Sequence, residues 1–126
     1  MGPKVLIVED EAVFAYTMQE VLSLFGFEVI GVAATVTEAL RLSELSRPDL
    51  AIFDVRLAGR RDGIEGAQLL RERSGLSVVF VSAQGDQPTR DRAAAVGPVA
   101  YLEKPVNSQE LIRAVVKGTR GQRNEQ

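Results

Sequence analysis

The sequence predicts an α/β fold: a doubly wound parallel sheet in a three-layer α/β/α sandwich. Short apolar runs occupy residues 5–8, 50–53, 78–81 and 100–102 and alternate with helical patterns. Each run is bounded by polar or turn residues, which is typical of parallel strands buried on both faces. Strands that alternate with helices favour right-handed crossovers and helices on both faces of the sheet.

The first half of the chain alternates strand and helix. A strand over residues 5–8 precedes apolar residues at helical spacing over 12–25, and Gly26 follows as a stop. Residues 28–33 form the next predicted strand. Thr35 and Glu38 have the spacing of a capping box and begin a helix that extends to about Leu45. Pro48 closes that helix, because the residue before a proline avoids helical geometry.

The second half repeats this alternation three times. The third strand ends at Asp54, and a polar loop over 58–63 leads to a helix over 64–73. A strand over 77–81 is followed by a helix capped by Asp86 or Thr89 and ending at Val96. After a short strand that ends at residue 102, Asn107 and Glu110 cap a helix to about Lys117. We expect one domain over residues 1–117, and a polar tail or linker start over 118–126.

Composition excludes several classes of function. The 126 residues leave room for one hydrophobic core. The absence of cysteine and histidine excludes disulfides, thiolate or imidazole metal sites and Ser-His or Cys-His catalysis. No run is long enough to span a bilayer and no signal peptide is evident, so we expect a cytoplasmic protein without a membrane partner. A net charge of −2 gives no reason to expect nucleic-acid binding by this domain.

Polar residues at the ends of the apolar runs predict a functional site. The carboxyl ends of parallel strands share one edge of the sheet. The residues concerned are Glu9, Asp10, Glu11, Asp54, Ser82 and Lys104. Taken singly, the acids could serve helix capping, Ser82 a local backbone group and Lys104 the solvent. Together they favour a divalent cation, Mg²⁺ above others, and an aspartate nucleophile that accepts a phosphoryl group.

The chain resembles the receiver domains of two-component response regulators from residue 4 to about residue 117. The resemblance rests on five motifs in register: Val8-Glu9-Asp10-Glu11, Phe53-Asp54, Asp62-Gly63, Val81-Ser82-Ala83 and Lys104-Pro105. It implies a flavodoxin-like sheet with strand order 2-1-3-4-5, in which strands one and three flank the ligand-binding switch point.

The resemblance also implies a role for each site residue. Asp54 would be the phosphoacceptor, and Mg²⁺, with Mn²⁺ as a substitute, would be bound by Glu9, Asp10, Asp54 and the backbone carbonyl of Arg56. Ser82, the backbone amide of Ala83 and Lys104 would bind the phosphoryl group, and Tyr101 would turn inward as a switch. Arg56 and Gln84 would tune the lifetime of the aspartyl phosphate, and the Lys104-Pro105 bond would be cis.

The implied partners are a sensor histidine kinase or a histidine phosphotransfer protein, and an unknown downstream protein or output domain. The switching surface would comprise the fourth helix, fifth strand and fifth helix, and it could support a phosphorylation-dependent homodimer. The sequence leaves open whether the protein acts alone or as part of a longer chain.

The loop over 54–63 is one residue longer than the commonest family version, with Ala58 where proline is frequent and with basic Arg56, Arg60 and Arg61.

Two other classes of function share parts of this pattern. A receiver-like or flavodoxin-like binding module that is never phosphorylated would not need the complete set of acids, hydroxyl and lysine, and a flavin phosphate disfavours an acidic loop. A phosphatase with an aspartate nucleophile would carry a second aspartate where this chain has Arg56. We therefore expect a phosphoacceptor regulator and not an enzyme with turnover.

Overall fold

A single parallel sheet forms the centre of the molecule. The computed structural model describes residues 2–57, 59, 61–83 and 85–123. The sheet has the order β2-β1-β3-β4-β5, which confirms the predicted topology. The strands are β1 (Lys4–Val8), β2 (Glu28–Ala33), β3 (Leu50–Asp54), β4 (Ser77–Ser82) and β5 (Ala100–Glu103).

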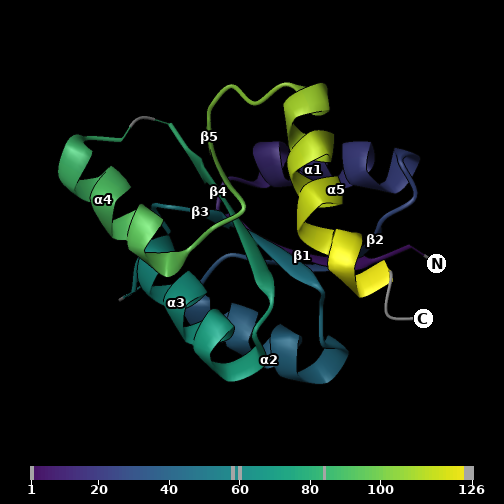
Figure 1. Cartoon of the computed structure of the whole chain (residues 1–126), viewed down its shortest axis with the longest axis horizontal. Coiled ribbons are helices and arrows are strands. Elements are labelled where there is room, and N and C mark those ends of the chain that lie inside the picture. The colour runs from purple at the N-terminus through teal and green to yellow at the C-terminus, as the bar shows by residue number, and fades with distance from the viewer. Residues whose placement is uncertain (1, 58, 60, 84, 124–126) are drawn as a thin grey trace.

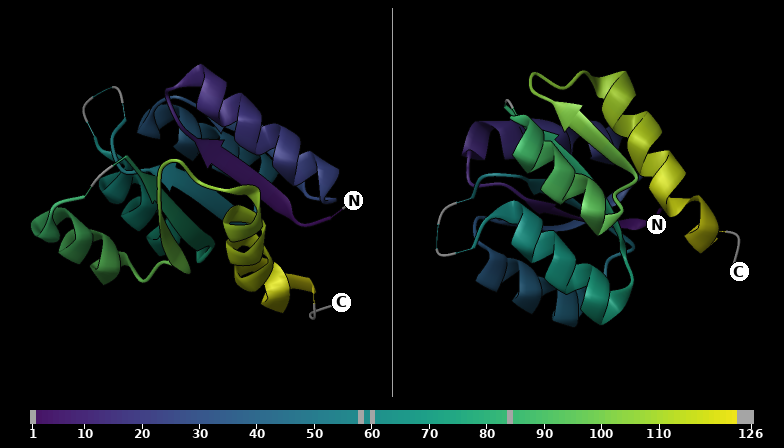
Figure 2. Two further views of the ribbon diagram at one scale, coloured as in Figure 1. Left: turned by 90° about the horizontal axis from the view of Figure 1, so that it is seen from above. Right: turned by 60° about the vertical axis from the view of Figure 1, so that its left-hand side comes forward.

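Helices cover both faces of this sheet, so the predicted three-layer sandwich is confirmed. They are α1 (Ala12–Leu24), α2 (Val36–Ser46), α3 (Gly63–Ser74), α4 (Gln87–Val96) and α5 (Ser108–Arg123). Helices α1 and α5 lie on one face and α2, α3 and α4 on the other (Figures 1 and 2). Among the residues described, no helix combines the length and the apolar character that crossing a membrane requires.

Burial on both faces explains why the central strands are continuous apolar runs. In β1, Leu6 and Val8 belong to the core under α2, α3 and α4, whereas Val5 and Ile7 belong to the core under α1 and α5. All four side chains have no exposed surface. Successive strand residues point to opposite faces, so each strand contributes to both cores at once. The edge of the sheet at the ends of β1 and β3 is thereby anchored from both sides.

Helix caps follow the predicted pattern. The Thr35 hydroxyl accepts the Glu38 amide at 3.2 Å, and the Asn107 side chain accepts the Glu110 amide at 2.7 Å. Asp86 is the cap of α4, because its carboxylate accepts the Thr89 amide at 2.8 Å. Side-chain oxygens at these positions satisfy amides that the helix itself leaves without partners.

The last helix extends further than its sequence pattern indicates. Helix α5 continues to Arg123, so the predicted end near Lys117 is wrong. The Gly118 carbonyl accepts the Ser77 hydroxyl at 2.8 Å, and a Cβ on Gly118 would overlap Leu50, which shows a close approach to the sheet. Thr119 is buried and satisfies its hydroxyl on the Val115 carbonyl at 2.8 Å. Contacts of Gly118 and burial of Thr119 therefore accompany the last turns of the helix, where apolar periodicity is weak.

A close backbone approach at the start of α3 generates a prediction. The Gly63 amide donates to the Val55 carbonyl at 2.9 Å, and a Cβ on Gly63 would overlap the Asp54 carbonyl. We expect Gly63→Ala to lower the free energy of unfolding by about 1–3 kcal/mol, because backbone atoms must move apart. Gly31→Ala is the matched control, since its Cβ would meet only the flexible end of Leu42 at 3.1 Å. Urea unfolding of both variants tests this, and equal losses would contradict the steric explanation.

Candidate phosphoryl and metal site

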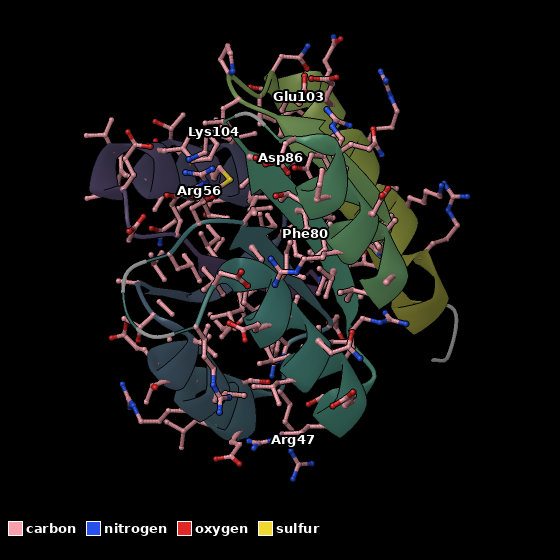
Figure 3. The ribbon with its side chains drawn as sticks, turned by 90° about the vertical axis from the view of Figure 1, so that its left-hand side faces the viewer. Arg47, Arg56, Phe80, Asp86, Glu103 and Lys104 are labelled. Carbon is pink, nitrogen blue, oxygen red and sulfur yellow. The ribbon has the colours of Figure 1, made fainter. Side chains whose placement is uncertain are left out.

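The functional side chains lie at the carboxyl-terminal edge of the sheet. Asp54 is the last residue of β3, and Glu9 and Asp10 directly follow the neighbouring strand β1. Asp54 is 6% exposed and Glu9 2%, whereas Asp10 is open to solvent. Figure 3 shows Lys104 and Arg56 at this edge, with Asp86 beside them and Arg47 at the opposite end of the molecule. The parallel sheet therefore gathers the residues that the sequence analysis grouped.

Three carboxylates form a cluster that suits a hard divalent cation. One oxygen each from Glu9, Asp10 and Asp54 lie within 4.8 Å of one another. Glu9 Oε1 is buried and makes no well-aligned hydrogen bond with a described residue, although the Lys104 ammonium group lies 3.2 Å away. Oxygen ligands from two or three carboxylates, with one side open to water, match what Mg²⁺ prefers. The donor set thus fits a cation of this class.

Burial makes Glu9 unusual among these acids. Removal from water, followed by a hydrogen bond with Asp54, raises the pKa of Glu9 to about 7. Glu9 Oε2 accepts the Glu11 amide at 3.0 Å, which opposes that rise. The Glu11 side chain, at the N-cap of α1, makes no capping hydrogen bond. The Glu11 side chain therefore does not serve as a helix cap.

Lys104 compensates the charge of the cluster. Its Nζ lies 3.1 Å from Asp54 Oδ2, 3.2 Å from Glu9 Oε1 and 3.4 Å from Glu11 Oε1. Burial by itself would lower the pKa of Lys104, but the hydrogen bond and charge of Asp54 and the charge of Glu9 raise it overall. The ammonium group also lies 4.5 Å from the centre of the Phe14 ring. Lys104 is therefore held charged among the acids.

A solvent-accessible cavity of about 550 Å³ opens beside Asp54. Asp54, Arg56, Ser82, Ala83, Gly85, Asp86 and Lys104 line it. Ser82 is buried at the end of β4, and its carbonyl accepts the Lys104 amide at 2.7 Å, which fixes β4 and β5 in register. Asp54 Oδ1 accepts the Arg56 amide at 3.0 Å, so the carboxylate is oriented by its own loop. The cavity has the polar lining that a phosphoryl group requires.

Some predicted site residues lie apart from this cavity. Tyr101 packs on Phe80 between the sheet and α4, and does not line the cavity. Gln84 falls outside the described residues, as do Ala58 and Arg60 in the basic loop. The peptide bond between Lys104 and Pro105 is cis.

Three residues of the site were not assigned to it from the sequence. Phe14 supports the ammonium group, and Gly85 and Asp86 line the cavity. Glu11, which was among the predicted acids, pairs with Lys104. Phe14, Gly85 and Asp86 carry no local signal of this kind, because a helical phenylalanine and a Gly-Asp turn are common elsewhere.

Known sequences resemble this chain over most of its length. The profile of the family described as "Response regulator receiver domain" matches residues 5–116. The transcriptional regulatory protein PdtaR of Mycobacterium tuberculosis is 38% identical over 112 residues, which are 89% of this chain and 54% of that protein. The phosphate regulon transcriptional regulatory protein PhoB of Rhizobium meliloti is 35% identical over 118 residues, 91% of this chain and 51% of that protein. The chain therefore spans about half the length of these relatives.

Solved structures agree with the fold. The signal receiver domain of a modulated diguanylate cyclase from Desulfovibrio desulfuricans has a TM-score of 0.91 and 36% identity, with full coverage of both chains. A CheY-like receiver domain protein from Methanospirillum hungatei has a TM-score of 0.88 and 26% identity, again with full coverage of both chains. The chain belongs to the family of response regulator receiver domains.

Proposed function

We propose that Asp54 accepts a phosphoryl group from a phosphohistidine of a sensor kinase or a histidine phosphotransfer protein. An Asp54 carboxylate oxygen forms a bond to phosphorus, and the bond from phosphorus to the donor nitrogen breaks. The electron pair stays with the imidazole, which takes up a proton from solvent. The observation that carries this proposal is the buried Asp54 carboxylate, held by Lys104 and the Arg56 amide beside an open polar cavity.

Glu9, Asp10, Asp54 and the Arg56 backbone carbonyl would hold Mg²⁺, which Mn²⁺ can replace. The cation neutralises charge on phosphoryl oxygens when it is bound. Lys104 supplies a second positive charge, and the Ser82 hydroxyl and the Ala83 amide can donate hydrogen bonds. These groups chiefly orient the reactants and stabilise charge, which is what phosphoryl transfer asks of a protein.

The output would be a change in the surface formed by α4, β5 and α5. A phosphoryl group adds about −1.5 to −2 charges and three acceptor oxygens. Ser82 ends β4 and Lys104 directly follows β5, so they would transmit this change to Tyr101 and α4 as a shift between two populations. A downstream protein or output domain, or a second copy of this chain, would bind the shifted surface. The domain would act as a regulator without turnover, and a cytoplasmic location stays a prediction.

The phosphoacceptor is tested by substitution. We expect acetyl phosphate and Mg²⁺ to add a phosphoryl group to the wild-type protein and to Asp49→Asn, but not to Asp54→Asn. Asp49 is the matched control, because it lies at the other edge of the sheet, where it accepts the Lys4 amide. Intact-mass measurement after acid quench gives the readout. A phosphorylated Asp54→Asn protein would contradict the assignment.

The cation site is tested with Asp10→Asn. Loss of one carboxylate ligand should weaken Mg²⁺ binding about tenfold or more, and so reduce the rise in melting temperature that Mg²⁺ produces. The metal-free variant should melt higher than the metal-free wild type, since one of three mutually repelling acids is gone. Thermal melts with and without Mg²⁺ measure both effects. Glu20→Gln on α1 is the control, and an unchanged Mg²⁺ response in Asp10→Asn would count against the site.

The lifetime of the aspartyl phosphate is tested with Arg56→Ala. The Arg56 side chain is exposed and lines the cavity, so its guanidinium can pair with the phosphoryl oxygens and shield them from water. Its removal should shorten the half-life about three- to tenfold without preventing phosphorylation. Decay of the mass shift after removal of the donor gives the rate, with Arg61→Ala in the same loop as control. A longer half-life would assign Arg56 to stabilising the transition state of hydrolysis.

A further inference from the structure

Tyr101 of β5 lies in a position that its hydroxyl group does not favour. The ring packs on Phe80 of β4, with ring centres 6.3 Å apart and planes inclined by 53°. The hydroxyl oxygen is buried, and no described residue makes a hydrogen bond with it. A buried hydroxyl without a partner is unfavourable, so other contacts must hold the ring in place.

Gly85 provides the space for this position. A Cβ on Gly85 would overlap the Tyr101 hydroxyl oxygen, so a side chain there requires the ring or the Gly85 backbone to move. Gly85 also lines the cavity beside Asp54. The loop that borders the phosphoryl site therefore touches the Tyr101 ring as well.

Arg90 of α4 lies over the Tyr101 ring. Its guanidinium carbon lies 5.0 Å from the centre of the Tyr101 ring, within the range of a cation–π interaction. Arg90 Nη2 also pairs with Glu103 Oε2. Tyr101 and Glu103 are two residues apart on β5, so they point to the same side of the sheet. One guanidinium group thus links α4 to two side chains of β5.

A cavity next to the Tyr101 ring could accept it. A cavity of about 350 Å³ between α4 and β5 is lined by Gln87, Arg90, Asp91, Ala94, Pro98 and Tyr101. An aromatic ring that leaves its place on Phe80 can turn into such a space without displacing the core. If the ring turned into this cavity, Tyr101 would have a second arrangement, and its contacts would decide which of the two is populated.

We propose that Arg90 is a positioning residue that clamps Tyr101 onto Phe80, and so holds the α4–β5 surface in its ring-inward arrangement before Asp54 is phosphorylated. The meaning of this arrangement for signalling rests on the function proposed above and on the inward turn of Tyr101 after phosphorylation that the family resemblance implies. The clamp gives this chain a resting equilibrium already shifted toward that state. Phosphorylation then has a smaller free-energy difference to supply.

Tyrosine fluorescence tests the clamp directly. The chain has two tyrosines and no tryptophan, so in a Tyr16→Phe background all emission comes from Tyr101. In this background Arg90→Ala should raise the ratio of exposed to buried Tyr101 about two- to fivefold, measured by acrylamide quenching of the unphosphorylated protein. Arg90→Lys, which keeps a cation near the ring, should restore part of the protection. Gly85→Ala should expose Tyr101 even with Arg90 present.

Arg92→Ala is the matched control on the same helix. Arg92 pairs with Asp62 at 3.0 Å, and among the described residues it makes no cation–π contact with the Tyr101 ring, so its loss should leave the quenching unchanged. Unchanged quenching in Arg90→Ala, or an equal rise in Arg92→Ala, would overturn the clamp. Arg90→Gln keeps a polar side chain and repeats the test if the alanine variant unfolds.

Phosphorylation of the same variants separates the two proposals. Arg90→Ala should still gain mass with acetyl phosphate, because Arg90 does not line the Asp54 cavity. Failure of the wild type to become phosphorylated would overturn the proposed function but leave the quenching result standing. Normal phosphorylation with unchanged quenching would overturn the clamp alone.

Discussion

The site depends on the compensation of clustered carboxylates by the ammonium group of Lys104. Glu9, Asp10 and Asp54 repel one another when they are charged, and two of them are almost fully buried. Lys104 Nζ lies within 3.4 Å of carboxylate oxygens of Asp54, Glu9 and Glu11, and its side chain is mostly buried. The pKa of Glu9 nevertheless rises to about 7, chiefly because the group is buried and secondarily because Asp54 lies beside it. A cluster of acids of this kind would attract a divalent cation to the site.

The core of the sheet makes that arrangement possible. Parallel pairing of β1 with β3 sets Val8 beside Phe53, so the acids that follow both strands must meet at one edge. The pairing of β4 with β5 brings Ser82 and Lys104 to the same edge. Residues without exposed surface anchor these strands on both faces, so the free energy gained by their burial can offset repulsion among the acids. The buried strand residues thus stabilise the fold, and the polar residues of the site lie at the ends of the strands.

Helix α4 connects this edge to the rest of the surface through polar contacts. Asp86, which begins the helix, lines the Asp54 cavity, and Arg92 pairs with the Asp62 cap of α3. Arg90 reaches Tyr101 and Glu103 on β5. Only Ala93 and Val96 of α4 are buried, so the helix is held by few apolar contacts. Elements of this kind rearrange at low free-energy cost, which suits a regulated surface.

The sequence by itself determined the fold class, the bounds of most elements and the residues gathered at the functional edge. It could do so because strand ends, caps and glycine stops act locally, and because parallel topology brings strand ends together. Only the tertiary structure decided that α5 continues to Arg123, since the contact of Gly118 with the sheet and the burial of Thr119 replace apolar periodicity. It alone showed Phe14 beneath Lys104 and Arg90 over Tyr101. Those contacts join distant segments, and side-chain packing across helices leaves no periodic signal in the sequence.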